Sequence, residues 1–223
     1  QIETSKHALA GKELQAALKG VHFLGIRSAS QLDAEVLNSV DRLVAVGCFC
    51  IGTNQVDLLA AQRRGVPVFN APFSNTRSVA ELALAEIIML MRGIPQRNAA
   101  AHRGAWMKSA THSHEIRGKT LGIIGYGHIG TQLGILAENM GMRVIYHDIE
   151  NKLPLGNAAN RPKLKDLLKE SHVVSLHVPQ TEQTACLVDS GFLKAMQSGA
   201  FLINASRGNV VEIDALAKAL KSG

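Results

Sequence analysis

Short apolar runs alternate with segments in which apolar residues recur at helical spacing, and this pattern is regular from Thr120 onward. Such alternation predicts a parallel sheet whose strands are joined by helices. The predicted strands are 121–125, 142–147, 172–178 and 200–204, and the predicted helices are 128–140, 163–170, 189–196 and 212–221. Because a complete doubly wound sheet of this kind has about six strands, we expect this sheet to be incomplete at its C-terminal end.

The first part of the chain repeats the alternation on a smaller scale. Strands are predicted at 21–26, which has the composition of a buried strand, and at 42–46 and 66–69, with helices before Gly20 and at 33–40 and 56–64. We therefore predict an α/β protein with two Rossmann-like domains, each built on a doubly wound parallel sheet. We predict the boundary between them after residue 75, so that the two domains are 1–75 and 76–223, both partial.

One long helix is predicted between these domains, over residues 78–100. Ser78 and Glu81 have the spacing of a capping box at its start. Its middle is apolar almost all round, which indicates burial on two sides. We expect it to connect the domains and to contribute to a dimer interface, although a central core helix would show the same pattern.

Three glycines follow the predicted strand 121–125 in the pattern Gly125-x-Gly127-x-x-Gly130, and a helical pattern begins there. This context is typical of a dinucleotide-binding turn. Gly125 permits the tight turn, Gly127 lets a pyrophosphate approach the backbone, and Gly130 lets the helix pack closely on the strand. The helix N-terminus favours the phosphates. The alternative is a turn with a structural role only.

An acidic residue completes this pattern. Asp148 ends the next predicted strand, eighteen residues after Gly130, close to the spacing of about 20 residues expected for the residue that binds the adenosine ribose. A carboxylate accepts a hydrogen bond from the 2′-hydroxyl and repels a 2′-phosphate. The sequence therefore favours NAD over NADP. We accordingly predict that residues 76–223 are a partial NAD-binding domain and that residues 1–75 are a partial substrate-binding domain.

Other candidates follow predicted strands, at the edge where open α/β sheets bind ligands. His177 and Pro179 end one strand, and Arg207 follows another. Arg207 is suited to hold a substrate carboxylate through two hydrogen bonds, but a surface pair with Glu212 is equally compatible with the sequence. A hydroxy acid dehydrogenase also needs a general base, usually a histidine held by a carboxylate, and no such pair is evident.

The composition of the chain limits the partners, metals and cellular locations that we expect for it. Hydrophobic residues make up 46% of the chain and charged residues 19%, and the net charge of +6 is spread without a basic block. We expect no nucleic-acid partner, no membrane span and a cytoplasmic location. Three cysteines without metal-ligand spacing favour reduced thiols, and His112 and His114 lack a third ligand, so we expect no metal.

The sequence resembles the D-isomer-specific 2-hydroxy acid dehydrogenases and, within them, the bacterial D-3-phosphoglycerate dehydrogenases that begin serine biosynthesis. The matching stretches are 47–57, 69–81, 124–130, 148–154 and 203–208. The resemblance implies NAD-dependent oxidation of D-3-phosphoglycerate to 3-phosphohydroxypyruvate by a homo-oligomer, a dimer or tetramer.

The resemblance also implies roles for individual residues. His128 and Ile129 would contact the cofactor phosphates, Asp148 the ribose, and Ala205, Ser206 and Arg207 the nicotinamide, with Arg207 also catalytic. The substrate-binding residues would be Arg27, Ser28, Gly52, Asn75 and Lys108, the last reaching the substrate phosphate from a neighbouring subunit.

Two departures from this pattern matter. The subgroup has Arg-Ser-Arg where this chain has Arg27-Ser28-Ala29, so one phosphate-binding charge is missing. The catalytic Glu and His of the family would lie beyond Gly223. We therefore expect a fragment that does not oxidise 3-phosphoglycerate by itself. The alternatives are a dehydrogenase for 2-hydroxyglutarate, glycerate or glyoxylate, and a corepressor-like scaffold that senses NAD.

Overall fold

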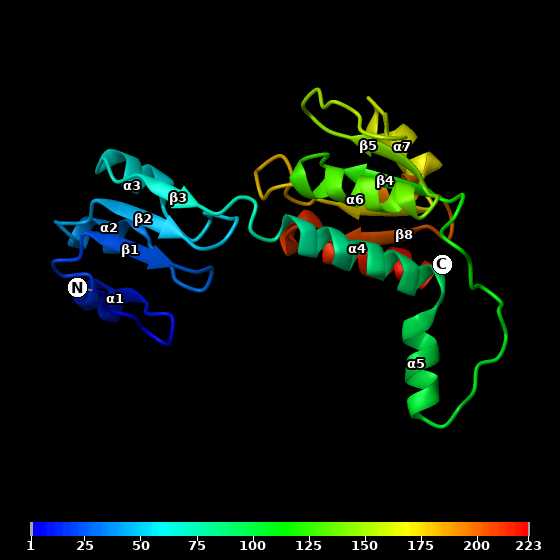
Figure 1. Cartoon of the computed structure of the whole chain (residues 1–223), viewed down its shortest axis with the longest axis horizontal. Coiled ribbons are helices and arrows are strands. Elements are labelled where there is room, and N and C mark those ends of the chain that lie inside the picture. The colour runs from blue at the N-terminus through cyan, green and yellow to red at the C-terminus, as the bar shows by residue number, and fades with distance from the viewer. Residues whose placement is uncertain (1, 223) are drawn as a thin grey trace. The chain divides into compact units, whose positions relative to one another are not determined.

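Figure 1 shows a computed structural model of the chain, which describes residues 2–222. The chain divides into two compact units between Asn75 and Thr76. Each unit has its own sheet, in which all the strands are parallel, and its own hydrophobic core. The parallel α/β class predicted from the sequence is thus confirmed.

The first unit is a three-stranded sheet with helices packed on it. Strands β1 (Phe23–Ile26), β2 (Ala45–Cys48) and β3 (Val68–Asn70) lie in this order, and the helices are α1 (Gly11–Ala17), α2 (Ala34–Ser39) and α3 (Leu58–Arg63). Leu32, Leu37 and Val46 are fully buried in the core that joins them.

Strand β1 is less buried than the sequence predicts. Phe23 keeps 74% of its surface exposed, and Ile26 is the one fully buried residue of the strand. Phe69 lies on the same face of the sheet and is 63% exposed. The α-helices cover the opposite face of the sheet. The apolar run therefore predicts the position of the strand correctly, but only one face of the strand is buried.

The second unit contains a five-stranded parallel sheet. Its order is β6 (Ala159–Asn160), β5 (Arg143–His147), β4 (Thr120–Ile124), β7 (Val173–Leu176) and β8 (Phe201–Asn204). The strand order reverses at β4, and ligands bind at such a switch point in open α/β sheets. Four of these strands are predicted from the sequence. The fifth, β6, has only two residues and no apolar run, so no periodicity could reveal it.

Helices cover both faces of this sheet (Figure 1). Helices α4 (Thr76–Met91) and α6 (His128–Asn139) pack on the face that carries Leu121 and Ile123. The opposite face carries Ile124 and Val174 and packs against α7 (Leu164–Glu170) and α8 (Ser190–Ala195), with α9 (Ile213–Ser222) beside α8. A short 3₁₀ turn, η1 (Gly208–Val210), precedes α9.

The single helix predicted over 78–100 is wrong. Helix α4 ends at Met91, and a separate helix α5 (Ile94–His102) follows. Gly93 between them has a φ of +61°, and Pro95 at the start of α5 has no N–H to continue a helical ladder. The predicted capping box is wrong too, because α4 begins before Ser78, and Glu81 instead pairs with the Nε of Arg77 at 2.6 Å.

Candidate functional site

The glycine-rich turn at the carboxyl end of β4 is held by close backbone contacts. Gly125 has a φ of +89°, and its N–H donates to the carbonyl oxygen of His147 at 3.0 Å. A Cβ at Gly125 would lie 2.7 Å from the carbonyl oxygen of His177. Any other residue would be strained in this left-handed conformation and would also clash with the end of β7.

The other two glycines serve different purposes. Gly127 is the N-cap of α6, and no atom of the described residues lies within 4 Å of the position that a Cβ would take there. A Cβ at Gly130 would lie 2.3 Å from the carbonyl oxygen of Gly125. Gly130 therefore allows the helix to pack on the turn, whereas Gly127 leaves open space beside the backbone.

This open space fits a pyrophosphate. It lies at the N-terminus of α6, a helix of 12 residues, where His128 is exposed and Ile129 is half-buried. A helix leaves the N–H groups of its first turn without acceptors inside the helix, and its dipole favours an anion there. The turn has the geometry expected of a dinucleotide site.

Asp148 is held in place by two backbone groups. Its Oδ2 accepts a hydrogen bond from the Tyr126 N–H at 2.7 Å, and its Oδ1 accepts one from the Glu150 N–H at 2.9 Å. Each carboxylate oxygen retains a lone pair for another donor. The half-buried carboxylate thus lies directly beside the glycine-rich turn and can accept further hydrogen bonds there.

Two buried tyrosines support this arrangement, although the spacing of residues in the sequence predicts no role for either. The rings of Tyr126 and Tyr146 are stacked, with centroids 4.0 Å apart and planes inclined by 15°. The Tyr146 hydroxyl donates to the carbonyl oxygen of Lys152 at 2.7 Å. Burial raises the pKa of the Tyr126 hydroxyl. The stack connects the glycine-rich turn to the loop after Asp148. In the sequence, this contact is indicated by an aromatic residue, Tyr126, between two glycines.

Arg207 follows β8 in a loop that Asn204 organises. The Asn204 Oδ1 accepts from the Ser206 N–H at 3.0 Å and from the Ser206 hydroxyl at 2.7 Å, and its Nδ2 donates to the carbonyl oxygen of Arg207 at 2.9 Å. The Arg207 side chain is exposed and forms no ion pair within residues 2–222, so the alternative pair with Glu212 is not made. Asn204 was missed, although an Asn two residues before a Ser is a turn signal.

His177 lies at the end of β7 in an apolar setting. Its Nε2 is 2.9 Å from the Ser175 hydroxyl, and its buried Nδ1 has no hydrogen-bond partner within residues 2–222. Burial lowers the pKa of His177 to about 4. The ring is therefore neutral at pH 7 and too weak a base to remove a proton from a hydroxyl group efficiently. Pro179 nearby is exposed, and its carbonyl accepts from the Thr184 hydroxyl at 2.7 Å.

The remaining predicted residues lie elsewhere. Arg27, Gly52 and Asn75 follow β1, β2 and β3 at the carboxyl edge of the first unit's sheet, with Ser28 and Ala29 exposed beside Arg27. The Gly52 carbonyl accepts from the Cys50 thiol at 3.3 Å. Lys108 is exposed in the segment between α5 and β4.

The structure of residues 2–222 also shows whether this part of the chain holds disulfides, metal sites or membrane-spanning helices. Cys48, Cys50 and Cys186 are free thiols. Residues 2–222 contain no group of three or more His, Cys, Asp and Glu side chains arranged to bind a metal ion. In the same part of the chain, no helix combines the length and apolar character needed to cross a membrane.

Four strand ends in the second unit thus carry the candidate chemistry. The glycine-rich turn follows β4, Asp148 follows β5, His177 follows β7 and Arg207 follows β8. Adjacent strands are about 4.8 Å apart, so this edge spans roughly 15 Å from Asp148 to Arg207. An extended dinucleotide with its reactive end near Arg207 matches that span.

Comparison with known proteins shows which protein family the chain belongs to. The family model for the D-isomer specific 2-hydroxyacid dehydrogenase NAD-binding domain matches residues 84–223. The chain belongs to this family. It is 62% identical over 222 residues to D-3-phosphoglycerate dehydrogenase of Haemophilus influenzae, covering 100% of this chain and 54% of that protein. The chain therefore spans about half the length of the curated relatives it matches.

Solved structures agree with this assignment. The TT0316 protein from Thermus thermophilus is 35% identical with a TM-score of 0.86, covering 94% of this chain and 67% of that one. D-lactate dehydrogenase from Aquifex aeolicus, complexed with NAD and lactic acid, is 29% identical with a TM-score of 0.86, covering 94% and 63%.

His177 should make stability depend on pH. Unfolded His177 has a pKa near 6.5 and folded His177 one of about 4, so the unfolded state binds a proton that the folded state does not. The free energy of unfolding should fall as pH decreases from 6.5 toward 4, by about 3 kcal/mol if the full difference applies. Urea unfolding followed by near-UV circular dichroism of Tyr126 and Tyr146 measures this. In His177→Gln the fall should be smaller, and an equal fall in both proteins would contradict the assignment.

Proposed function

We propose that the whole protein to which this chain belongs oxidises D-3-phosphoglycerate to 3-phosphohydroxypyruvate with NAD, the first step of L-serine biosynthesis, and that residues 1–223 alone do not. The observation that carries this proposal is the 62% identity over the chain to a D-3-phosphoglycerate dehydrogenase. A dinucleotide turn and an exposed arginine on one sheet edge support it. The protein would act in the cytoplasm on a small phosphorylated hydroxy acid.

NAD fits the residues present. The open space at Gly127 and the first turn of α6 would hold the pyrophosphate, and Asp148 would accept from the adenosine ribose. Ala205 and Ser206 would line the nicotinamide, with His177 and Pro179 beside them. Bound NAD would supply the acceptor for the hydride that the oxidation of a hydroxy acid releases. The neutral ring of His177 adds no charge beside the nicotinamide.

Arg207 would orient the substrate. Its guanidinium can bind the carboxylate through two parallel hydrogen bonds, and the remaining positive charge stabilises the oxygen that becomes a carbonyl. Its backbone is fixed by Asn204, so the side chain extends from a defined position. A lysine could not reproduce the planar arrangement of donors.

Residues of the first unit and Lys108 would determine which substrate the protein prefers. Arg27 and Ser28, at the end of β1, would bind the phosphate together with Gly52 and Asn75. Ala29 supplies no charge there. The alternative substrates are unphosphorylated hydroxy acids such as glycerate or 2-hydroxyglutarate, which the missing charge would favour. An NAD-sensing scaffold would need no substrate.

We also propose that the protein is a homo-oligomer assembled through α4. Ala80, Ala83 and Ile87 bury one face of this helix in its own unit, whereas Leu82 is 58% and Met89 is 40% exposed. Leu82 and Met89 are seven residues apart and therefore share the other face. A second copy would cover these side chains and would bring a second Lys108.

The glycine-rich turn gives a matched pair of variants. Gly127→Ala should keep the stability of the wild type but bind NAD at least about tenfold more weakly, because its methyl group fills the open space. Gly130→Ala should lower stability, since its Cβ would lie 2.3 Å from a backbone oxygen. Calorimetric titration with NAD and urea unfolding separate the two effects. Unchanged NAD affinity in Gly127→Ala would contradict the assignment of the cofactor site.

The reaction is tested on the whole protein. We expect kcat/KM for D-3-phosphoglycerate to exceed that for D-glycerate or D-2-hydroxyglutarate by about a hundredfold or more. Arg207→Gln should lower kcat/KM by about a hundredfold or more, whereas exposed Arg63→Gln, a change of the same type, should not. Equal values for phosphorylated and unphosphorylated acids would favour the alternative substrates, and no oxidation of any of them would favour the scaffold.

Oligomerisation is tested by sedimentation of the purified chain. The wild type should sediment with at least twice the mass of 23.9 kDa. Leu82→Glu should sediment as a monomer because it places a charge in the proposed interface, whereas Leu59→Glu, an exposed leucine of the first unit, should not. A monomeric wild type would contradict the proposal.

A further inference from the structure

A hollow lies at the opposite edge of the same sheet, where the strands begin. It has a volume of about 120 Å³ and is lined by Met91, His114, Lys119, His172 and residues 197–201. Lys119 and His172 directly precede β4 and β7, and residues 197–201 lead into β8. Because the glycine-rich turn is at the carboxyl ends of the strands, the hollow is separate from the cofactor site.

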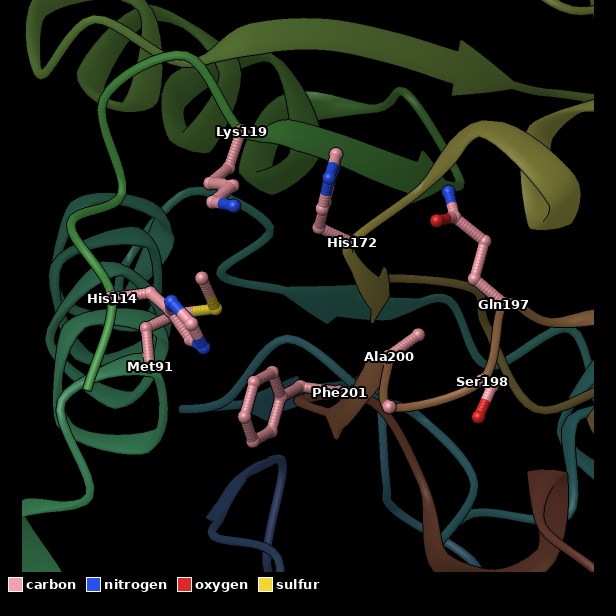
Figure 2. A pocket seen from close by; sticks show the side chains of 9 residues that line it. Met91, His114, Lys119, His172, Gln197, Ser198, Ala200 and Phe201 are labelled. Atoms are coloured by element: carbon pink, nitrogen blue, oxygen red, sulfur yellow. The ribbon is translucent and has the colours of Figure 1, made fainter. Parts of the chain in front are cut away.

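Lys119 gives the hollow a positive charge. Figure 2 shows its side chain reaching into the space between His114 and His172. Its ammonium group forms no ion pair within residues 2–222. Among the described residues, no Asp or Glu lines the hollow. The nearest acids in sequence are engaged elsewhere, since Glu115 pairs with Arg117 and Glu170 with Arg161.

His172 adds a hydrogen-bond donor. Its Nδ1 accepts from the Thr120 N–H at 3.0 Å, so in the neutral ring the proton is on Nε2. Burial and the nearby Lys119 charge both lower the pKa of His172. The ring is therefore a neutral donor at pH 7, and a negative charge in the hollow would raise its pKa again.

These features indicate the charge and the size of the ligand that the hollow could bind. A metal cation would be repelled by Lys119 and would find only two histidines among the lining residues. The volume of about 120 Å³ exceeds the roughly 10–15 Å³ that one water needs and approaches the roughly 150 Å³ of a cavity that binds benzene. Met91 and Phe201 supply apolar walls. We propose that this hollow binds a small phosphate- or carboxylate-bearing molecule, held by the Lys119 ammonium and the His172 Nε2–H.

Inorganic phosphate is the probe for this site. In the purified chain, saturated with NAD to occupy the glycine-rich turn, phosphate should shift the NMR signals of the Ala200 methyl group and the Phe201 ring saturably, and it should raise the pKa of His172. Lys119→Gln should weaken phosphate binding at least about tenfold. Lys165→Gln, an exposed lysine of α7, should leave it unchanged.

A second variant separates loss of the His172 hydrogen-bond donor from loss of stability. In His172→Asn the side-chain oxygen can still accept from the Thr120 N–H, but the Nε2–H is lost, and phosphate binding should weaken while the thermal unfolding temperature is kept. Acetate in place of phosphate distinguishes a carboxylate from a phosphate ligand. The proposal is overturned if chloride at equal ionic strength gives the same shifts, if the shifts do not saturate, or if Lys119→Gln leaves them unchanged.

Discussion

The second unit depends on one close approach, that of the glycine-rich turn to the end of the neighbouring strand. A Cβ at Gly125 would lie 2.7 Å from the carbonyl oxygen of His177, and one at Gly130 would lie 2.3 Å from the carbonyl oxygen of Gly125. Strand, turn and helix are therefore packed backbone against backbone, without intervening side chains. This packing places the N-terminus of α6 beside Gly127, at the end of β4, where the strand order also reverses.

Charge is distributed unevenly between the two edges of this sheet. At the carboxyl edge, the fixed features are the amide groups of α6, the oriented carboxylate of Asp148 and the exposed guanidinium of Arg207. The buried ring next to them, His177, is kept neutral by its surroundings. At the amino edge, Lys119 lies without an acidic partner in the described residues. A single sheet thus carries polar and charged groups at both ends of its strands, on residues that adjoin the strands rather than belong to the core.

Periodicity and glycine spacing were sufficient for most of the fold but not for its interruptions. Apolar runs located the strands because buried parallel strands are almost continuously hydrophobic. They missed β6, whose two residues are held by pairing to β5 and not by apolar character. The break between α4 and α5 has a signal in the sequence, because Gly93 and Pro95 both interrupt helices, but the apolar content of the segment outweighs that signal. At the candidate site, residue types predict the turn, Asp148 and Arg207. The contacts of Tyr146, Ser175 and Asn204 depend on particular side-chain and backbone groups that spacing does not specify.

The two hydrogen bonds that fix Asp148 have an evolutionary consequence. Removal of the carboxylate would leave the N–H groups of Tyr126 and Glu150 without their acceptor. The Glu150 N–H is exposed and can bond to water, but the Tyr126 N–H is partly buried, and an unsatisfied amide there costs about 1–3 kcal/mol. A lineage that replaced Asp148 would therefore loosen the glycine-rich turn at the same time, unless a new hydroxyl or amide oxygen in the loop after β5 took over the bond to Tyr126.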